Sequence, residues 1–349
     1  MKISLKDTVK TIMSNPGGDH RYFGWPTIAR LKNGRIAVGA SGYRLEHVCP
    51  FGKGVVAYSD DEGESYTAPK AIIDTVLDDR DVGLTTFGDS GLIVTSFNNT
   101  TAFQRGNMPQ TNECFDYIDS VDPDEEEKAL GCTFRISLDN GESFSKIYKS
   151  PVTSPHGPIT LNNGKILWIG TVYGANERVE IYELNPENGD MTFVSEIKSE
   201  LYLDEPHAIQ LPDGRIVCHF RIEDEKRGIF TLLQTVSFDD GKSWSEPRQI
   251  IGDDSGAPAH LFRHSSGLLI STFGRRSYVC GIRAIISRDN GENWSEEYII
   301  YENPDTDDDL GYPSTIELHD GTLLTAFYSK DTEDAPAVIM QQKWCIEDI

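Results

Sequence analysis

Residues 237–244 read Ser-Phe-Asp-Asp-Gly-Lys-Ser-Trp, and the same spacing of Ser, Asp, Gly and an aromatic side chain occurs three more times. The other copies are Ser-Asp-Asp-Glu-Gly-Glu-Ser-Tyr at 59–66, Ser-Leu-Asp-Asn-Gly-Glu-Ser-Phe at 137–144 and Ser-Arg-Asp-Asn-Gly-Glu-Asn-Trp at 287–294. The Asp carboxylate can accept hydrogen bonds from turn N–H groups, and the Gly two residues later tolerates a positive φ. Because each copy follows a short apolar segment, the four copies predict hairpin turns in a repeated all-β architecture.

A second repeat, out of phase with the first, marks the start of each unit. It consists of a Pro or small residue, an alternating apolar segment, a Gly-containing turn and another apolar segment. Its six copies begin at residues 24, 80, 156, 204, 256 and 311. Six units of this size predict a six-bladed β-propeller with four strands in each blade around a central channel. The stretch from Leu5 to Met13 is predicted to supply the outer strand that closes the ring.

One long segment departs from this rhythm. The prediction is a single propeller domain over residues 1–349 with an insertion in blade two at about 98–130, which carries an acidic run at 122–127. The insertion is either a solvated loop or a flap over the channel mouth. A second acidic run, 305–309, predicts a solvated turn, with a rim contact or a weak cation site as the alternatives.

The charge of the chain limits its partners. There are 32 basic and 56 acidic residues, for a net charge of -24, which argues against nucleic acid or an anionic membrane surface. The six cysteines are scattered without a zinc-like spacing, so we predict reduced, packed thiols and no metal or cofactor. The first residues lack the apolar run of a signal peptide, and no stretch has the roughly 18 apolar residues of a membrane helix. We therefore expect a cytoplasmic protein with no membrane partner.

The six blade starts can be aligned, and one aligned position is unusual. In a propeller the first strand of every blade lies nearest the channel, so equivalent residues of the six starts are expected to share one ring of positions. We call these the ring positions: Trp25, Asp81, Gly157, Glu205, Ala257 and Tyr312. Two acids and a tyrosine at equivalent sites favour a functional pocket over side chains that only satisfy the local backbone.

Arginines follow the second predicted strand of three blades. They are Arg44, Arg221 and the pair Arg275 and Arg276. A guanidinium group holds a carboxylate through two parallel hydrogen bonds and stays charged at any working pH, so these residues predict an anion site. The alternative is that each pairs with a neighbouring acid such as Glu46 or Glu223.

The four turns have the pattern known as the Asp box, and the chain resembles the sialidases and other Asp-box propellers over nearly its whole length. The segment from Glu205 to Arg221 is similar to the one that carries a catalytic Glu and a substrate-binding Arg in sialidases. The segment around Tyr312 looks like the one with the nucleophilic Tyr, and Asp81 matches a pocket Asp. The resemblance implies that the acid/base falls on Glu46, with His47 as the alternative.

The resemblance fails at one place. Sialidases begin blade one with Arg-Ile-Pro, and that Arg is the first of three that grip the carboxylate of the sugar. Here the three residues are Gly-Trp-Pro at 24–26. Arg21 is the predicted replacement, and Arg275, Arg276 and Arg283 are alternatives for the third arginine.

The function that the resemblance implies is a sialidase-like exo-glycoside hydrolase. It removes a terminal acidic sugar, sialic acid or a relative, by a retaining mechanism with Tyr312 as nucleophile and Glu205 as base. A phenol suits an anomeric carbon that carries a carboxylate, because a carboxylate nucleophile would be repelled. The substrate is a small molecule or glycan with a carboxylate. The alternatives are a non-catalytic propeller that binds glycans or proteins, and a propeller glycosidase or lyase for another acidic sugar.

Overall fold

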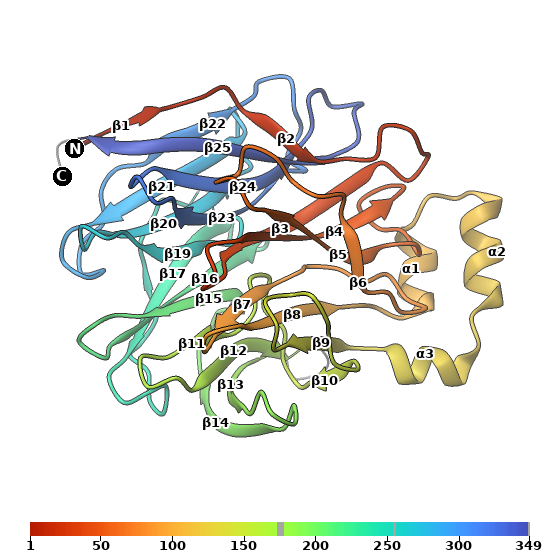
Figure 1. The fold of residues 1–349 in the computed structure, drawn as a ribbon, viewed down its shortest axis with the longest axis horizontal. Coiled ribbons are helices and arrows are strands. Elements are labelled where there is room, and N and C mark those ends of the chain that lie inside the picture. Colours follow the sequence, from red (N-terminus) through yellow and green to blue (C-terminus); the bar gives the residue numbers. More distant parts are fainter. Residues whose placement is uncertain (173–177, 254–255, 348–349) are drawn as a thin grey trace.

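The computed structural model describes residues 1–172, 178–253 and 256–347, and six antiparallel sheets stand in a ring in this part of the chain (Figure 1). Each sheet is one blade, so the predicted six-bladed β-propeller is confirmed.

The strands follow one another along the chain within each blade, and their bounds agree with the predicted starts. Blade one contains β3 (Tyr22–Arg30), β4 (Ile36–Arg44), β5 (Lys53–Ser59) and β6 (Lys70–Ile73). Blade two contains β7 (Leu84–Phe87), β8 (Gly91–Phe97), β9 (Cys132–Ser137) and β10 (Tyr148–Ser150). Blade three contains β11 (Ile159–Thr160), β12 (Ile166–Val172), β13 (Arg178–Leu184) and β14 (Met191–Ile197).

The second half of the ring repeats this arrangement. Blade four contains β15 (Asp204–Gln210), β16 (Ile216–Asp224), β17 (Ile229–Ser237) and β18 (Arg248–Gln249). Blade five contains β19 (His260–Arg263), β20 (Leu269–Arg275), β21 (Gly281–Ser287) and β22 (Tyr298–Glu302). Blade six contains β23 (Gly311–Glu317), β24 (Leu323–Ser329) and β25 (Val338–Glu347), joined by β1 (Lys2–Leu5) and β2 (Lys10–Met13).

The N-terminal segment closes the ring. β1 pairs antiparallel with β25, with Leu5 opposite Trp344, and β2 pairs with an earlier part of β25, with Met13 opposite Ile339. The predicted outer strand therefore exists as two short strands, and the first of them begins before Leu5. Because the first strands complete the last blade, the outer edge of β25 is paired instead of open.

Packing between neighbouring blades holds the ring together. One cluster joins the first and last blades and contains Ile28, Val38, Ile316 and Leu324, all buried. Full burial of such a side chain contributes about 1.5–3 kcal/mol. Similar clusters lie between the other blades.

Three histidines from successive blades meet in the interior. The rings of His156, His207 and His260 lie 4.3–5.4 Å apart, and all three are buried. Burial lowers the pKa of each imidazole well below its usual value. Neutral side chains therefore fill this part of the molecule.

The Asp boxes form the turns that were predicted from their sequence. Ser237 Oγ donates to Asp239 and accepts the Gly241 N–H, each at 2.9 Å, and the Ser243 N–H donates to Asp239 at 2.9 Å. The other three boxes repeat the Gly-to-Ser hydrogen bond at 2.8–2.9 Å. All four follow the third strand of a blade, so they lie at the opposite end of the blade from the loop between the second and third strands.

The insertion in blade two, for which the sequence left a solvated loop and a flap as alternatives, is helical. It forms α1 (Thr101–Asn107), α2 (Asn112–Ser120) and α3 (Pro123–Ala129) at one edge of the ring (Figure 1). Met108, Cys114 and Ile118 of the insertion pack against Leu45, Val48 and Phe51 of the loop after β4. The helices therefore support the loop that carries Glu46 and His47.

All six cysteines are free, as the sequence predicts. Within the described residues no helix is long and apolar enough to cross a membrane.

Candidate functional site

The ring positions share an unusual backbone conformation. Trp25, Asp81, Glu205 and Tyr312 have φ values of 45–54°, and Gly157 has a φ of 81°. Side chains other than Gly rarely adopt positive φ, and such residues cluster at functional sites. In blades one, four and six the strand register also shifts at this point. The structural equivalence inferred from the sequence alignment is thus visible in the backbone, and only blade five differs, with the positive φ on Gly256.

Three of the predicted site residues form one hydrogen-bonded chain. Tyr312 Oη donates to Oε1 of Glu205, and Arg221 Nη1 donates to Oε2 of the same carboxylate at 2.8 Å. Arg221 also pairs with Glu223. The backbone at each ring position turns these side chains toward one another, although Glu205 and Tyr312 are 107 residues apart in the chain. Tyr312 and Glu205 are only 5% and 8% exposed, so the pair is shielded from bulk water.

The charges around Tyr312 determine its protonation. Burial and the carboxylates of Glu205 and Asp81 raise the pKa of the Tyr312 phenol well above its usual value, although Arg221 and Arg276 oppose the shift. The phenol is therefore neutral at ordinary pH and needs a base to become a nucleophile. Glu205, which already accepts its hydrogen bond, is placed to be that base.

Asp81 occupies the ring position of blade two. Burial, the largest cause, raises the pKa of its carboxyl to about 7; the Arg80 charge lowers it, and the Glu205 charge raises it further. A carboxyl with this pKa is partly protonated near neutral pH, so Asp81 can act there as a hydrogen-bond donor.

Arg276 is the second arginine beside Tyr312. Its guanidinium carbon lies 5.9 Å from the centre of the Tyr312 ring. It is held there by hydrogen bonds from Nε to the Leu310 carbonyl at 3.1 Å and from Nη2 to the Tyr328 hydroxyl at 3.2 Å. Arg221 and Arg276 therefore place two positive charges near Tyr312.

Trp25 packs near Tyr312, with the two ring centres 6.5 Å apart. Its side chain is 1% exposed. The guanidinium groups of Arg80 and Arg44 lie 4.2 Å and 4.8 Å from its ring centre. Trp25 thus fills the position where the sialidase pattern has an arginine.

A cavity of about 350 Å³, which we call the mouth cavity, is lined in part by Tyr22 and His47, whose rings pack against Trp25. Arg21, Glu46, His47, Asp309 and Lys330 are among the residues that line it. Arg21 and Glu46 are exposed. The structure therefore brings the predicted Arg21 and Glu46 to one cavity, whereas Arg221 and Arg276 contact the Tyr312 cluster.

Arg44, a predicted substrate contact, has a different environment. Its side chain is fully buried, and Nη2 donates to Asp78 at 2.8 Å and to the His47 carbonyl at 2.8 Å. Arg221 lies opposite Asp204, directly before a ring position, but Arg44 lies opposite Tyr22, three residues before Trp25. The prediction that Arg44 binds substrate is therefore corrected: its register leads to a structural ion pair.

The adjacent arginines of blade five also differ. Arg275 forms an ion pair with Glu297 at 3.0 Å, and Arg283 pairs with both Glu297 and Glu302. Of the three alternatives for the third arginine, Arg276 is the one that lies over Tyr312.

Sequence reasoning missed Arg80 and Tyr328. Tyr328 lies opposite Gly311, the residue before a ring position, in the same register as Arg221 opposite Asp204. An alignment of the second strands would have found it. Arg80 was visible in the sequence as the neighbour of Asp81, but its contact with Trp25 depends on the packing of blades one and two.

No group of three or more His, Cys, Asp and Glu side chains in the described ranges is arranged to hold a metal ion.

Solved structures share this fold. A protein of unknown function from Dyadobacter fermentans superimposes with a TM-score of 0.78 over 99% of both chains at 18% identity. The NanB sialidase from Streptococcus pneumoniae has a TM-score of 0.73 and 13% identity over 99% of this chain and 72% of its own. The intramolecular trans-sialidase from Ruminococcus gnavus has a TM-score of 0.69 and 11% identity over 97% of this chain and 98% of its own. At these identities the likeness shows the fold alone.

Among curated proteins, none matches the sequence. The model of the BNR repeat-like domain family matches residues 93–325, which is about two thirds of the chain. Together with the six blades and the four Asp boxes, this match shows that the chain belongs to the BNR repeat-like domain family.

Proposed function

We propose that the protein is a retaining exo-glycoside hydrolase that removes a terminal acidic sugar from a glycan or small glycoside. The hydrogen-bonded chain of Tyr312, Glu205 and Arg221 is the observation that carries this proposal. A buried tyrosine bonded to a carboxylate, which is itself bonded to an arginine, has the parts of an activated nucleophile: the attacking group, its base and the group that orients the base.

The first step forms a covalent glycosyl-enzyme. Glu205 takes the phenolic proton while Tyr312 Oη attacks the anomeric carbon, and the bond from that carbon to the glycosidic oxygen breaks. The leaving oxygen takes a proton from an acid at the mouth cavity. In the second step water attacks the same carbon and gives a proton back to the acid at the mouth cavity, the bond to Tyr312 breaks, and Glu205 returns its proton to the phenolate.

The choice of an acidic sugar rests on the two arginines. In a chain with a net charge of -24, Arg221 and Arg276 are placed beside the nucleophile. Each charge-assisted hydrogen bond to a carboxylate contributes about 1.5–3 kcal/mol. Asp81, when protonated, is available as a third donor.

Trp25 favours a second candidate, a glycosidase or lyase for an acidic sugar other than sialic acid. This residue stands where sialidases have the first of their three arginines, and Arg21 is not seen to replace that arginine beside Tyr312. A site with two arginines fits a uronic acid as well as a sialic acid.

A panel of fluorogenic sialosides and uronides tests the proposal. We expect turnover of at least one member, and a fall of about 10²–10⁴-fold in kcat for Tyr312→Phe. Mass spectrometry of the product separates hydrolysis from elimination or intramolecular transfer, because only hydrolysis adds water to the sugar. Turnover by Tyr312→Phe at the wild-type rate, or binding of acidic glycans without any turnover, would contradict the proposal.

A further inference from the structure

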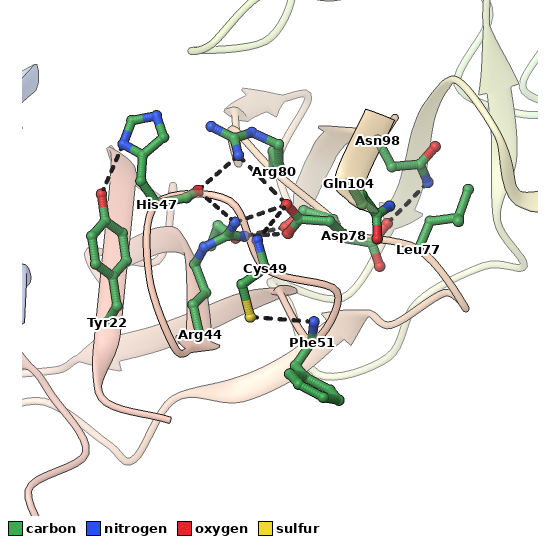
Figure 2. Close-up of polar contacts among 12 residues, drawn as sticks. Tyr22, Arg44, His47, Cys49, Phe51, Leu77, Asp78, Arg80, Asn98 and Gln104 are labelled. Carbon is green, nitrogen blue, oxygen red and sulfur yellow. Dashed lines mark hydrogen bonds and ion pairs between the residues drawn. The ribbon is translucent and has the colours of Figure 1, made fainter. Parts of the chain in front are cut away.

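The loop between β4 and β5 is held in place at His47. The His47 carbonyl accepts hydrogen bonds from Arg44 Nη2 and Arg80 Nη1, both at 2.8 Å (Figure 2). Both guanidinium groups also contact the buried carboxylate of Asp78. Two arginines on one buried acid thus position the backbone of an otherwise exposed loop residue.

The side chain of His47 is oriented by Asp309, which is 262 residues away in the chain. His47 Nδ1 lies 2.9 Å from Asp309 Oδ1. The same carboxylate accepts the Tyr22 hydroxyl at 2.9 Å and Lys330 Nζ at 3.3 Å. Burial alone would raise the pKa of Asp309, but its bonds to His47 and Tyr22 and the charge of Lys330 hold that pKa well below its usual range. The ionised carboxylate requires a hydrogen on Nδ1, so Nε2 is the nitrogen left for other partners.

His47 lies between the mouth cavity and Trp25. Its side chain is 48% exposed and lines the mouth cavity. Its ring packs edge-on against Trp25 at 4.9 Å, and Trp25 in turn lies 6.5 Å from Tyr312. His47 and Tyr312 therefore flank the same indole, with the nucleophile in the buried cluster and the imidazole on the cavity side.

Glu46, the acid implied by the resemblance to sialidases, lacks such support. It is exposed, and within the described residues its side chain forms no hydrogen bond or ion pair, whereas its backbone carbonyl accepts Arg44 Nε at 3.3 Å. A proton donor must stay within hydrogen-bond reach of the leaving oxygen, and an exposed carboxylate without a bonding partner is not fixed in that way.

We propose that His47, oriented by Asp309, is the general acid and base of the glycosidase reaction. This inference rests on the proposed function. In the first step His47 Nε2–H⁺ gives its proton to the glycosidic oxygen as the anomeric carbon bonds to Tyr312 Oη, which releases the alcohol. In the second step the neutral Nε2 takes a proton from the attacking water as the bond to Tyr312 breaks. His47 thereby returns to its protonated state, and the net reaction adds one water.

The groups that face His47 determine the pH at which it acts. They are Asp309, Tyr22 and Lys330 on the cavity side, and Arg80 and Arg44 beneath the loop. Burial lowers the pKa of His47, the bond to Asp309 raises it, and the Arg80 and Arg44 charges lower it. The net result is a pKa below the usual value of 6.5. Since the acid must be protonated, cleavage of substrates with poor leaving groups falls as the pH rises through the lowered pKa of His47.

Substrates with different leaving groups test this role. An aryl glycoside has a phenolate leaving group that needs little protonation, whereas an alkyl glycoside or glycan needs a proton donor. For His47→Gln we expect kcat/KM to fall about 10²–10⁴-fold on the alkyl glycoside and less than about tenfold on the aryl glycoside. His319→Gln is the matched control, because His319 is also exposed and held by a carboxylate, Glu62 at 2.8 Å, but is not among the residues that line the mouth cavity. It should leave both rates unchanged.

The other outcomes are decisive. Equal losses on both substrates for His47→Gln, or a leaving-group-dependent loss for Glu46→Gln instead, would overturn the inference while Tyr312→Phe still supports the proposed function. A wild-type protein that turns over neither substrate overturns both proposals. Asp309 is a positioning residue, so Asp309→Asn should lower the pKa of His47 in an NMR titration and move the alkaline limb of the pH profile to lower pH. If neither the alkaline limb of the pH profile nor the NMR titration of His47 shifts in Asp309→Asn, the role of Asp309 is refuted.

Discussion

The Asp-box turns and the ring positions both recur around the propeller, but the boxes repeat their side chains whereas the ring positions repeat only their backbone conformation. In the boxes the side chains recur, and each Gly N–H donates to the Ser hydroxyl at 2.8–2.9 Å. At the ring positions only the backbone recurs, with φ near 50° at four residues, while the side chains are Trp, Asp, Gly, Glu, Ala and Tyr. A turn needs the same hydrogen bonds in every blade. A site needs different groups that meet, and a common backbone can present them from different blades.

The largest expected effect is on the ring positions. Glu205→Gln should lower kcat about 10²–10⁴-fold, because an amide cannot take the proton of Tyr312. The double variant Tyr312→Phe with Glu205→Gln should be no slower than the slower single variant, since the two groups act as one unit. Steady-state kinetics on the best substrate of the panel measures both. Losses that multiply would show that the two residues act independently.

The second effect concerns the buried ion pair of Asp78 with Arg44 and Arg80, which supports the loop between β4 and β5. Asp78→Asn leaves Arg44 and Arg80 without their shared carboxylate, and removal of one partner of a buried pair costs about 3–5 kcal/mol. Denaturant unfolding measures this loss. Asp74→Asn is the control, because Asp74 forms a half-exposed pair with Lys53 that is worth at most about 1 kcal/mol. If the free energy of unfolding falls by the same amount in the two variants, the buried pair is not a main support of the loop between β4 and β5.

The third effect is on a box. Asp239→Ala removes the acceptor of three hydrogen bonds in an exposed turn and should lower the free energy of unfolding by about 1–2 kcal/mol, with kcat unchanged. Asp190→Ala, in the blade-three turn without a box, should change it by less than about 0.5 kcal/mol. A large loss of activity in Asp239→Ala would show that the boxes and the site are coupled.

The smallest effect is the pH dependence of the stability that one Asp box contributes. Hydrogen bonds from Ser143, first from its hydroxyl and then from its N–H, lower the pKa of Asp139 from 3.8 to about 2. Its contribution to stability is therefore present above the unfolded-state pKa and is lost as the pH falls toward 2. Thermal melts of wild type and Asp139→Ala should differ at pH 5 and converge near pH 2. A difference that persists at pH 2 would assign the effect to something other than the charge.

Much of the fold could be read from the sequence because its rules are local. A box is eight consecutive residues whose hydrogen bonds close within the turn, so its recurrence predicts the hairpins directly. The blade starts predicted the six sheets and the ring positions, and through them the meeting of Glu205 and Tyr312. The helices of the insertion were not predicted, although their N-cap residues Thr100, Thr111 and Asp122 are sequence signals for the start of a helix.

The remainder depends on register and on contacts that span the ring. Arg44 and Arg221 have the same place in the sequence repeat, but they differ in register. Arg44 lies opposite the residue three before its ring position and is buried on Asp78, whereas Arg221 lies opposite the residue directly before its ring position and contacts Glu205. His47 meets Asp309 only because the ring brings blades six and one together. A repeat shows which residues are equivalent within their own blades. Which side chains touch across blades is set by β-bulges, burial and closure, and these act between residues hundreds of positions apart.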